Sequence, residues 1–318
     1  MEVINKETEG VDNMKAIIVT DEAAGTAGMQ LVERPRPTPG INDVIVQVHA
    51  AGFVSNELEW PSTWVDRTGR NRTPSVPGHE LAGVVTALGY GTTGLSVGQR
   101  VFGLADWHRD GAFAGYIAIE ARNLAPLPVN IDFTVGASLP ISALTAWQGL
   151  FQHGRLQAGQ RVLAHGAAGA VGSIVTQLAS QAGAYVIGTG RGKDRQKVLD
   201  LGAREYVDLE KDTLEDVGGI DLVFDVLGGE IQKRSAALIN SGGILVSVVG
   251  PVEAKPADSL AVDFVVEASR SELIEIAKRV ADGKLLPNIG TTMTLDDAIA
   301  MINGKEKLKG KTIVRVSS

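Results

Sequence analysis

The chain has 318 residues, enough for two domains of ordinary size, since a single hydrophobic core rarely grows past roughly 250–300 residues. Its 44% apolar and 21% charged residues are typical of a globular protein and exclude a disordered or fibrous one. A net charge of −7 argues against nucleic acid or an anionic membrane as the main partner, and no apolar run approaches the roughly 20 residues of a membrane span. The chain has no cysteine, which excludes disulfides and thiolate zinc sites.

The N-terminal part of the sequence predicts β structure. Residues 1–13 are polar and acidic, and we expect a loose extension there without a secretory signal, which favours a cytoplasmic protein. From about residue 15 to 127, short β-branched runs such as residues 44–48 and 116–119 are separated by Gly and Pro. This pattern predicts a compact, mostly antiparallel β domain with long loops.

The pattern changes at about residue 134. Apolar segments then alternate with helix-compatible ones of about ten residues, and the expected strands are residues 161–165, 184–188, 205–207, 221–225 and 243–249. Residues 135–152 also form an apolar, helix-compatible stretch. The alternation predicts βαβ units and a parallel sheet. After two amphipathic helices at 273–281 and 296–302, we expect a closing strand at 312–316 that completes the first domain.

A glycine pattern, Gly166-x-x-Gly169-x-x-Gly172, lies between an expected strand and an expected helix. Glycine there lets the backbone turn tightly and approach a pyrophosphate, while the N-terminus of the helix offers unpaired N–H groups. The spacing differs from the usual pattern because Ala168 stands where a middle glycine is expected, so a plain tight turn is the alternative. The strand–loop–helix–strand context favours a dinucleotide.

The end of the second expected strand bears on cofactor choice. An NAD site usually has Asp or Glu there to bind the ribose 2′-hydroxyl. Here Gly190 occupies that position and Arg191, Lys193 and Arg195 follow. Arginine can hold a 2′-phosphate through two hydrogen bonds, which favours NADP(H) over NAD(H). The alternative is a solvated basic helix start, and Asp194 weakens the positive field.

These motifs resemble the medium-chain dehydrogenase/reductase superfamily, and the chain is most similar to its zinc-free quinone oxidoreductase branch. The resemblance rests on residues 77–85, 139–147, 166–172, 225–229 and 264–267. It implies an α/β fold with a doubly wound Rossmann domain at residues 134–262. It also implies a GroES-like, mostly antiparallel β catalytic domain at residues 1–133, to which residues 263–318 return. NADP(H) and a small substrate would meet in the cleft between the domains.

The resemblance also implies individual cofactor contacts. Thr145 would contact the nicotinamide, and the pyrophosphate would contact Ala168, Gly169, Ala170 and Val171. The 2′-phosphate would be bound by Gly190, Arg191 and Arg195. The walls around the adenosine and the nicotinamide would be formed by Leu227, Val249, Phe264, Val265 and Val266. Zinc-dependent relatives hold a catalytic metal through two Cys and one His. The matching positions here are Val54, His79 and Ile141, so we expect no metal and interpret His79 as a structural or hydrogen-bonding residue.

Without a metal, the expected reaction is hydride delivery from NADPH to a quinone or an α,β-unsaturated carbonyl compound. Trp60, Trp64, Trp107 and Tyr116 would stand near the cleft as flat walls for such substrates, with ordinary packing as the alternative. Tyr116 and Glu57 are weak candidates for a proton relay, and the sequence identifies no catalytic residue beyond them.

Two other functions stay open at this point. One is a catalytically silent, NADPH-binding regulatory protein, and the other is a zinc-free alcohol dehydrogenase, which would need a base that the sequence does not identify. We expect a homodimer with two-fold symmetry, joined at the edges of the parallel sheets, and residues 242–249 are the candidate edge.

Overall fold

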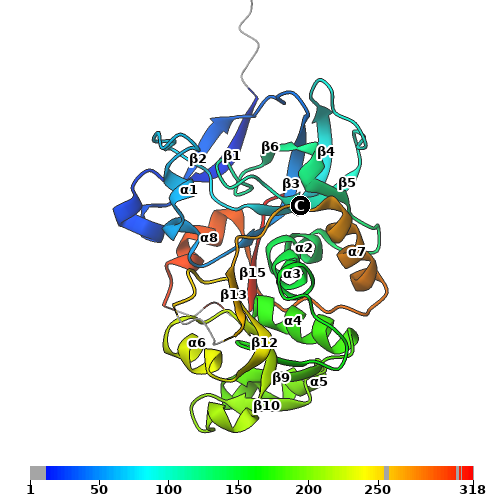
Figure 1. The fold of residues 1–318 in the computed structure, drawn as a ribbon. Helices are drawn as coiled ribbons and strands as arrows, with labels where there is room; N and C mark the ends of the chain where they lie inside the picture. The colour runs from blue at the N-terminus through cyan, green and yellow to red at the C-terminus, as the bar shows by residue number, and fades with distance from the viewer. Residues whose placement is uncertain (1–11, 254–257, 306–307, 309, 318) are drawn as a thin grey trace, which may run out of the picture.

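The computed structural model describes residues 12–253, 258–305, 308 and 310–317, which form two β-sheet units that pack against each other (Figure 1). Most of the expected loose extension, residues 1–11, lies outside the described part, and Asn13 already begins a strand. The strands form a six-stranded, a seven-stranded and a two-stranded sheet. The six-stranded sheet is parallel throughout and the seven-stranded sheet is mostly antiparallel, so the predicted fold class is confirmed.

The seven-stranded sheet has the order β14-β15-β3-β4-β5-β7, with β6 also paired to β3. Its strands are β3 (Asp43–Phe53), β4 (Glu80–Leu88), β5 (Arg100–Leu104), β6 (Tyr116–Glu120), β7 (Leu124–Pro126), β14 (Ile289–Thr294) and β15 (Lys311–Arg315). The two-stranded sheet pairs β1 (Asn13–Ile18) with β2 (Gln30–Pro35). Short helical turns fill the connections, namely η1 (Glu22–Gly28), η2 (Glu57–Glu59), α1 (Pro61–Trp64) and η3 (Ala121–Asn123).

The six-stranded sheet has the order β10-β9-β8-β11-β12-β13. Its strands are β8 (Arg161–Ala164), β9 (Tyr185–Gly190), β10 (Glu205–Asp208), β11 (Ile220–Asp225), β12 (Ile239–Ser247) and β13 (Leu260–Asp263). The crossovers contain α4 (Ala170–Gln181), η5 (Gly192–Asp194), α5 (Arg195–Asp200), η6 (Leu214–Val217) and α6 (Gly229–Ala236). The chain runs outward in both directions from β8 and β11. Ligands of such sheets bind where the strand order reverses, at the carboxyl ends of these two strands.

The C-terminal segment confirms one prediction and corrects another. Strand β15 pairs antiparallel with β3, so the closing strand joins the first sheet as expected. Residues 242–249 are not a sheet edge, because β13 pairs in parallel with β12 and covers it. The sequence reasoning missed β13 because its four residues, Leu260–Asp263, alternate too briefly to give a periodic signal.

The apolar stretch at residues 135–152 is not one helix. It is divided into α2 (Phe133–Ala137), α3 (Pro140–Trp147) and the π-helical turn η4 (Gln148–His153). Pro140 begins α3 because its missing N–H and fixed φ suit a first helical position. The remaining helices, α7 (Arg270–Ala281) and α8 (Leu295–Ile302), lie close to the positions expected for them.

The two sheet units share one hydrophobic core. Ala82 and Phe102 of the antiparallel sheet belong to the same buried cluster as Leu144 of α3 and Phe224 of β11. Burying a Leu or Phe side chain stabilises the fold by about 1.5–3 kcal/mol, so Phe102, Leu144 and Phe224 help to hold the two units together. No helix in the described part of the chain combines the length and apolar character that a bilayer span requires.

Candidate dinucleotide and substrate site

The glycine loop lies at the switch point of the parallel sheet, directly after β8. Gly166 has a φ of +56°, a conformation that favours glycine, and Gly169 is the N-cap of α4. A Cβ atom on residue 172 would lie 2.2 Å from the carbonyl oxygen of Gly166. Glycine is therefore required at residue 172 for α4 to begin this close to the strand. The result is a helix N-terminus whose free N–H groups can receive a phosphate.

The end of β9 is equally dependent on a small residue. A Cβ atom on Gly190 would lie 2.6 Å from the hydroxyl of Tyr206 on β10. That hydroxyl donates a hydrogen bond to the Arg191 carbonyl at 2.6 Å. Burial, with nearby Asp194 and Asp208, raises the pKa of Tyr206 to about 12, so its phenol stays protonated. Tyr206 thereby supports the backbone of the basic segment.

The basic segment is paired with carboxylates. The Arg191 Nε lies 3.8 Å from Glu210 Oε1, and Arg195 Nη2 lies 3.1 Å from Asp212 Oδ2. The Arg195 guanidinium also lies over the Tyr206 ring, 5.3 Å from its centroid. A cavity of about 380 Å³ opens here, lined by Arg191, Gly192, Lys193, Asp208, Glu210 and Lys211. Of the residues expected at a 2′-phosphate, Arg191 lines this cavity, whereas Gly190 and Arg195 are not part of its lining. The cavity is lined by both cations and carboxylates.

One cation near the loop was missed by the sequence analysis. Lys197 Nζ lies 2.6 Å from Asn288 Oδ1 and 3.5 Å from the carbonyl oxygen of Ala168. The Asn288 amide donates to the same carbonyl at 2.7 Å. The spacing of Lys197, two residues after Arg195, could have indicated it, whereas Asn288 lies about 120 residues away in the chain and gives no local signal.

A second cavity, of about 590 Å³, adjoins the glycine loop and is mostly apolar. We call it the chamber. The chamber brings together most of the residues expected near the nicotinamide and two of the three tryptophans expected near the cleft. It is lined by Val54, Asn56, Trp60, Pro61, Ser62, Trp107, His108, Ile141, Thr145, Val171, Val226, Val248, Val249, Phe264, Val265 and Val266. The Trp60 and Trp107 rings meet edge to face, with centroids 5.0 Å apart and planes at 89°. Such walls and such a volume suit a small, flat, apolar ligand.

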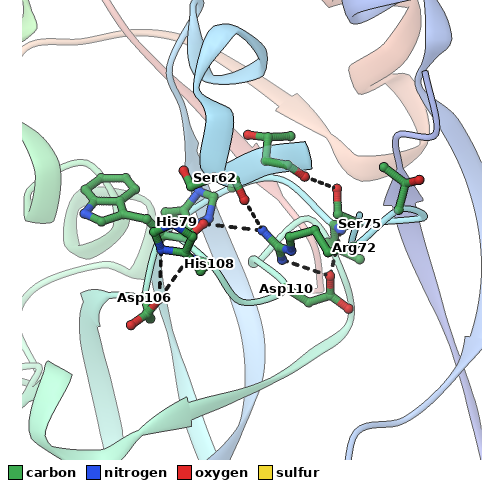
Figure 2. Close-up of polar contacts among 12 residues, drawn as sticks. Ser62, Arg72, Ser75, His79, Asp106, His108 and Asp110 are labelled. Atoms are coloured by element: carbon green, nitrogen blue, oxygen red, sulfur yellow. Dashed lines mark hydrogen bonds and ion pairs between the residues drawn. The ribbon is translucent and has the colours of Figure 1, made fainter. Parts of the chain in front are cut away.

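A partly buried arginine, Arg72, connects two walls of the chamber (Figure 2). Arg72 Nη1 donates to the Ser62 carbonyl at 2.6 Å and, at 3.4 Å, to the Trp107 carbonyl. Its Nη2 lies 3.4 Å from Asp110 Oδ1, which also accepts the backbone N–H of Val76. Burial lowers the pKa of Arg72, and Asp110 opposes that effect. No sequence motif indicated Arg72, because its partners lie 10 to 38 residues away.

Glu57 and His79 form a buried pair behind the tryptophans. Glu57 Oε1 lies 2.5 Å from His79 Nδ1 and accepts the Gly78 N–H at 2.6 Å. The His79 ring lies 5.2 Å from Trp107 and 6.4 Å from Trp60, centroid to centroid. Neither residue lines the chamber. His79 is thus held in a hydrogen bond, as the sequence interpretation proposed.

The residues do not fit a zinc ion at the position used by zinc-dependent relatives. Val54 and Ile141 offer only aliphatic side chains, so the Nε2 atom of His79, which has no hydrogen-bond partner, would be the one ligand left of three. One imidazole cannot hold a zinc ion by itself. The neighbouring Glu80 is fully buried, pairs with Lys311 and accepts the Ile141 N–H at 3.0 Å. Burial raises the pKa of Glu80. Within the described ranges, no group of three His, Asp or Glu side chains converges as a metal site.

Three expected residues lie elsewhere. Tyr116 lines a separate cavity of about 460 Å³, and the Arg36 guanidinium lies 4.1 Å from its ring centroid. Trp64 is not at the cleft, because it is buried in the core and its indole N–H donates to the Leu58 carbonyl at 2.8 Å. Leu227 is exposed just after β11 and lines neither the chamber nor the basic pocket.

His165, a buried residue directly before the glycine loop, links the elements around that loop through hydrogen bonds. His165 follows β8, and its two ring nitrogens lie 2.8 Å from Thr189 Oγ1 and 2.7 Å from Ser235 Oγ. Burial lowers the pKa of His165 to about 4, although nearby Asp225 opposes the shift. The ring is therefore neutral at pH 7, and it joins β8, β9 and α6 through hydrogen bonds rather than charge.

Comparisons with known proteins match both halves of the chain. The family model described as alcohol dehydrogenase GroES-like domain matches residues 40–129, and the one described as zinc-binding dehydrogenase matches residues 170–284. Quinone oxidoreductase of Rattus norvegicus is 32% identical over 239 residues, covering 71% of this chain and 70% of that protein. A probable zinc-binding oxidoreductase, mitochondrial, of Arthroderma benhamiae is 29% identical and covers 91% of this chain and 93% of its own.

Solved structures show the same likeness over nearly the whole length. The quinone oxidoreductase from Coxiella burnetii superposes with a TM-score of 0.87 at 26% identity, covering 96% of this chain and all of the other. An alcohol dehydrogenase superfamily protein from Novosphingobium aromaticivorans reaches 0.83 at 28% identity with the same coverage. The parallel unit and the antiparallel unit therefore occur together, in this arrangement, in other proteins.

Proposed function

The chain belongs to the medium-chain dehydrogenase/reductase superfamily, in its quinone oxidoreductase branch, and we propose that it is an NADPH-dependent reductase of quinones or α,β-unsaturated carbonyl compounds that works without a metal. The observation that carries this proposal is the chamber beside the glycine loop. An apolar cavity with an edge-to-face tryptophan pair adjoins the expected nicotinamide position, and its aliphatic residues Val54 and Ile141 stand where a metal would need ligands.

The described residues fit a dinucleotide. The helix N-terminus at Gly169 would receive the pyrophosphate, and Ala170 and Val171 follow it as the first turn of α4. Thr145, at the other side of the chamber, would contact the nicotinamide together with the segment at Phe264. Gly190, Arg191 and Arg195 would surround a 2′-phosphate, which supports NADP(H) over NAD(H).

When bound, the reduced nicotinamide supplies a hydride, that is, two electrons and a proton. A conjugated substrate can accept it because the charge spreads onto a carbonyl oxygen, and water can return the balancing proton. The protein's own contribution is orientation and exclusion of water: Trp60 and Trp107 would stack a flat ring, and the aliphatic lining keeps the reacting atoms dry. This division of labour needs no acid or base in direct contact with the substrate.

The test is equilibrium binding followed by turnover. We expect calorimetry to show tighter binding of NADPH than of NADH, and absorbance at the reduced-nicotinamide band to fall when menadione or an enone is added. Binding without oxidation across a broad panel of quinones and enones would favour a silent regulatory protein. Reduction of NADP⁺ by alcohols would favour an alcohol dehydrogenase, and no binding of either dinucleotide would overturn the proposal.

We further propose a cytoplasmic homodimer. The parallel sheet has two edge strands, β10 and β13, and we propose β13, Leu260–Asp263, as the pairing edge because Leu260 is an exposed apolar side chain on it. An unpaired edge of this kind invites a second copy related by two-fold symmetry. Sedimentation of the purified chain at micromolar concentration would reveal a monomer if this is wrong.

A further inference from the structure

Arg191, one of the cations expected at a 2′-phosphate, already has an anionic partner on its own chain. Glu210 follows β10, the strand next to β9 in the sheet, so its side chain reaches the same sheet edge as Arg191. The Arg191 Nε and Glu210 Oε1 atoms lie 3.8 Å apart. Both side chains line the cavity at the end of β9, and they are 59% and 67% exposed. An incoming anion can therefore reach the guanidinium.

The neighbouring pair, Arg195 and Asp212, is built differently. Asp212 Oδ2 accepts both Arg195 Nη2 at 3.1 Å and the backbone N–H of Asp208 at 2.8 Å. Arg195 is also held over the Tyr206 ring. Asp212 is thus fixed by the backbone and keeps Arg195 in position. Glu210, by contrast, has no contact to its carboxylate other than Arg191 among the residues that the structure describes, so it is the displaceable anion of the pocket.

We propose that Glu210 determines cofactor selectivity by competing with the 2′-phosphate for Arg191, which lowers the preference for NADP(H) over NAD(H). This inference rests on the proposed function, since it concerns the same dinucleotide site. Binding of a 2′-phosphate requires that the Glu210 carboxylate leave the Arg191 guanidinium, and the bound phosphate is then repelled by that nearby carboxylate. A 2′-hydroxyl carries no charge, so its binding has neither of these free-energy costs. An exposed ion pair of this type changes affinity by about two- to fivefold.

The probe that isolates this effect is a pair of nucleotides, 2′,5′-ADP and 5′-AMP, which differ only in the 2′-phosphate. Calorimetry should show that Glu210→Gln raises the ratio of their affinities about two- to fivefold. The matched control is Glu215→Gln, which removes the same charge from another exposed Glu–Arg pair of this unit, Glu215 with Arg234 at 2.7 Å. An unchanged ratio in Glu210→Gln, or an equal rise in Glu215→Gln, would overturn the proposal.

A double-mutant cycle tests whether Glu210 acts through Arg191. In an Arg191→Gln background, Glu210→Gln should raise the ratio less than in the wild type, because only the repulsion between the carboxylate and the phosphate remains. A full rise there would contradict the mechanism. The proposed function can be separated from this inference by the wild-type protein. If it oxidises NADPH with menadione while Glu210→Gln leaves the nucleotide ratio unmoved, only this inference fails. If it binds neither nucleotide and oxidises no NADPH, both fail.

Discussion

The two halves of the candidate site are built in different ways. The dinucleotide half lies within consecutive βαβ units, from the glycine loop at residue 166 to Glu210 after β10, and its contacts are mostly between neighbouring strands. The chamber half is assembled from separate segments around Trp60, Trp107, Ile141, Val226 and Phe264. Changes in the first half should therefore affect dinucleotide binding and stability together. Changes at chamber residues that are not expected to contact the nicotinamide, such as Trp60 and Trp107, should affect the second substrate alone.

The largest expected effect comes from His165, under the dinucleotide half. Its pKa in the folded state is about 4, below the usual value of 6.5, so the unfolded chain takes up a proton first as pH falls. The stability it contributes is complete above pH 6.5 and decreases as pH falls towards 4, by about 3 kcal/mol. Urea unfolding of the wild type and His165→Asn across this range should show a shallower pH dependence in the variant. Parallel curves would contradict the assignment.

Next in size is Gly172→Ala. Its Cβ would meet the Gly166 carbonyl oxygen at 2.2 Å, so the loop must shift to relieve the overlap, at a cost of about 1–3 kcal/mol in folding stability. Because a shifted loop no longer presents its N–H groups to the pyrophosphate, we expect NADPH affinity to fall about tenfold. Gly304→Ala is the control, since the nearest atom there is 3.2 Å away and the residue is exposed. Titration of NADPH by intrinsic fluorescence would measure both. Wild-type affinity in Gly172→Ala would mean that the loop does not seat the cofactor.

A change in the chamber half should behave in the opposite way. Arg72→Met removes the charged hydrogen bonds that hold the Ser62 and Trp107 backbones, and we expect the KM for menadione to rise about tenfold with NADPH affinity unchanged. Steady-state kinetics with each substrate varied in turn would separate the two. Arg70→Met, an exposed arginine nearby, should leave both unchanged. Equal losses for both substrates would mean that the halves are not independent.

The smallest expected effect is that of Trp107→Leu. Loss of one aromatic wall should lower kcat/KM for a flat bicyclic quinone about threefold relative to that for an aliphatic enone, because the substitution removes ring stacking. The measurement is the ratio of kcat/KM for the two substrates. Tyr90→Leu, at an exposed aromatic remote from the chamber lining, should not change the ratio. A ratio unchanged in Trp107→Leu would exclude stacking on this ring.

This difference in construction also explains what the sequence could predict. The geometry of a βαβ unit is nearly constant, so the spacing of residues along it determines where they lie in space. Gly166, Gly190 and Arg191 can therefore be placed from the sequence alone. Arg72 and Asn288 cannot, because their partners are set by loop packing between distant segments. The family resemblance implies that Trp64 and Tyr116 lie near the cleft, yet one packs in the core and the other lines a different cavity.

The carboxylates of the basic pocket could not be predicted from the sequence either. The sequence indicates Arg191 and Arg195 as neighbours in one segment, but Glu210 and Asp212 belong to the turn that follows the next strand. Only the parallel register of β9 and β10 brings the carboxylates to the guanidinium groups. A positive cluster in the sequence is thus a balanced one in the structure, and cofactor preference has to be argued from the pairs.

We propose that hydride transfer from NADPH takes place in the chamber without a metal. The most direct measurement is the initial rate of NADPH oxidation with menadione before and after exhaustive dialysis against a strong chelator. We expect a saturable rate that is the same in both samples, because Val54 and Ile141 offer no ligand atoms and His79 alone cannot hold zinc. A rate that is lost on dialysis and restored by zinc, or no rate in either sample, would contradict it.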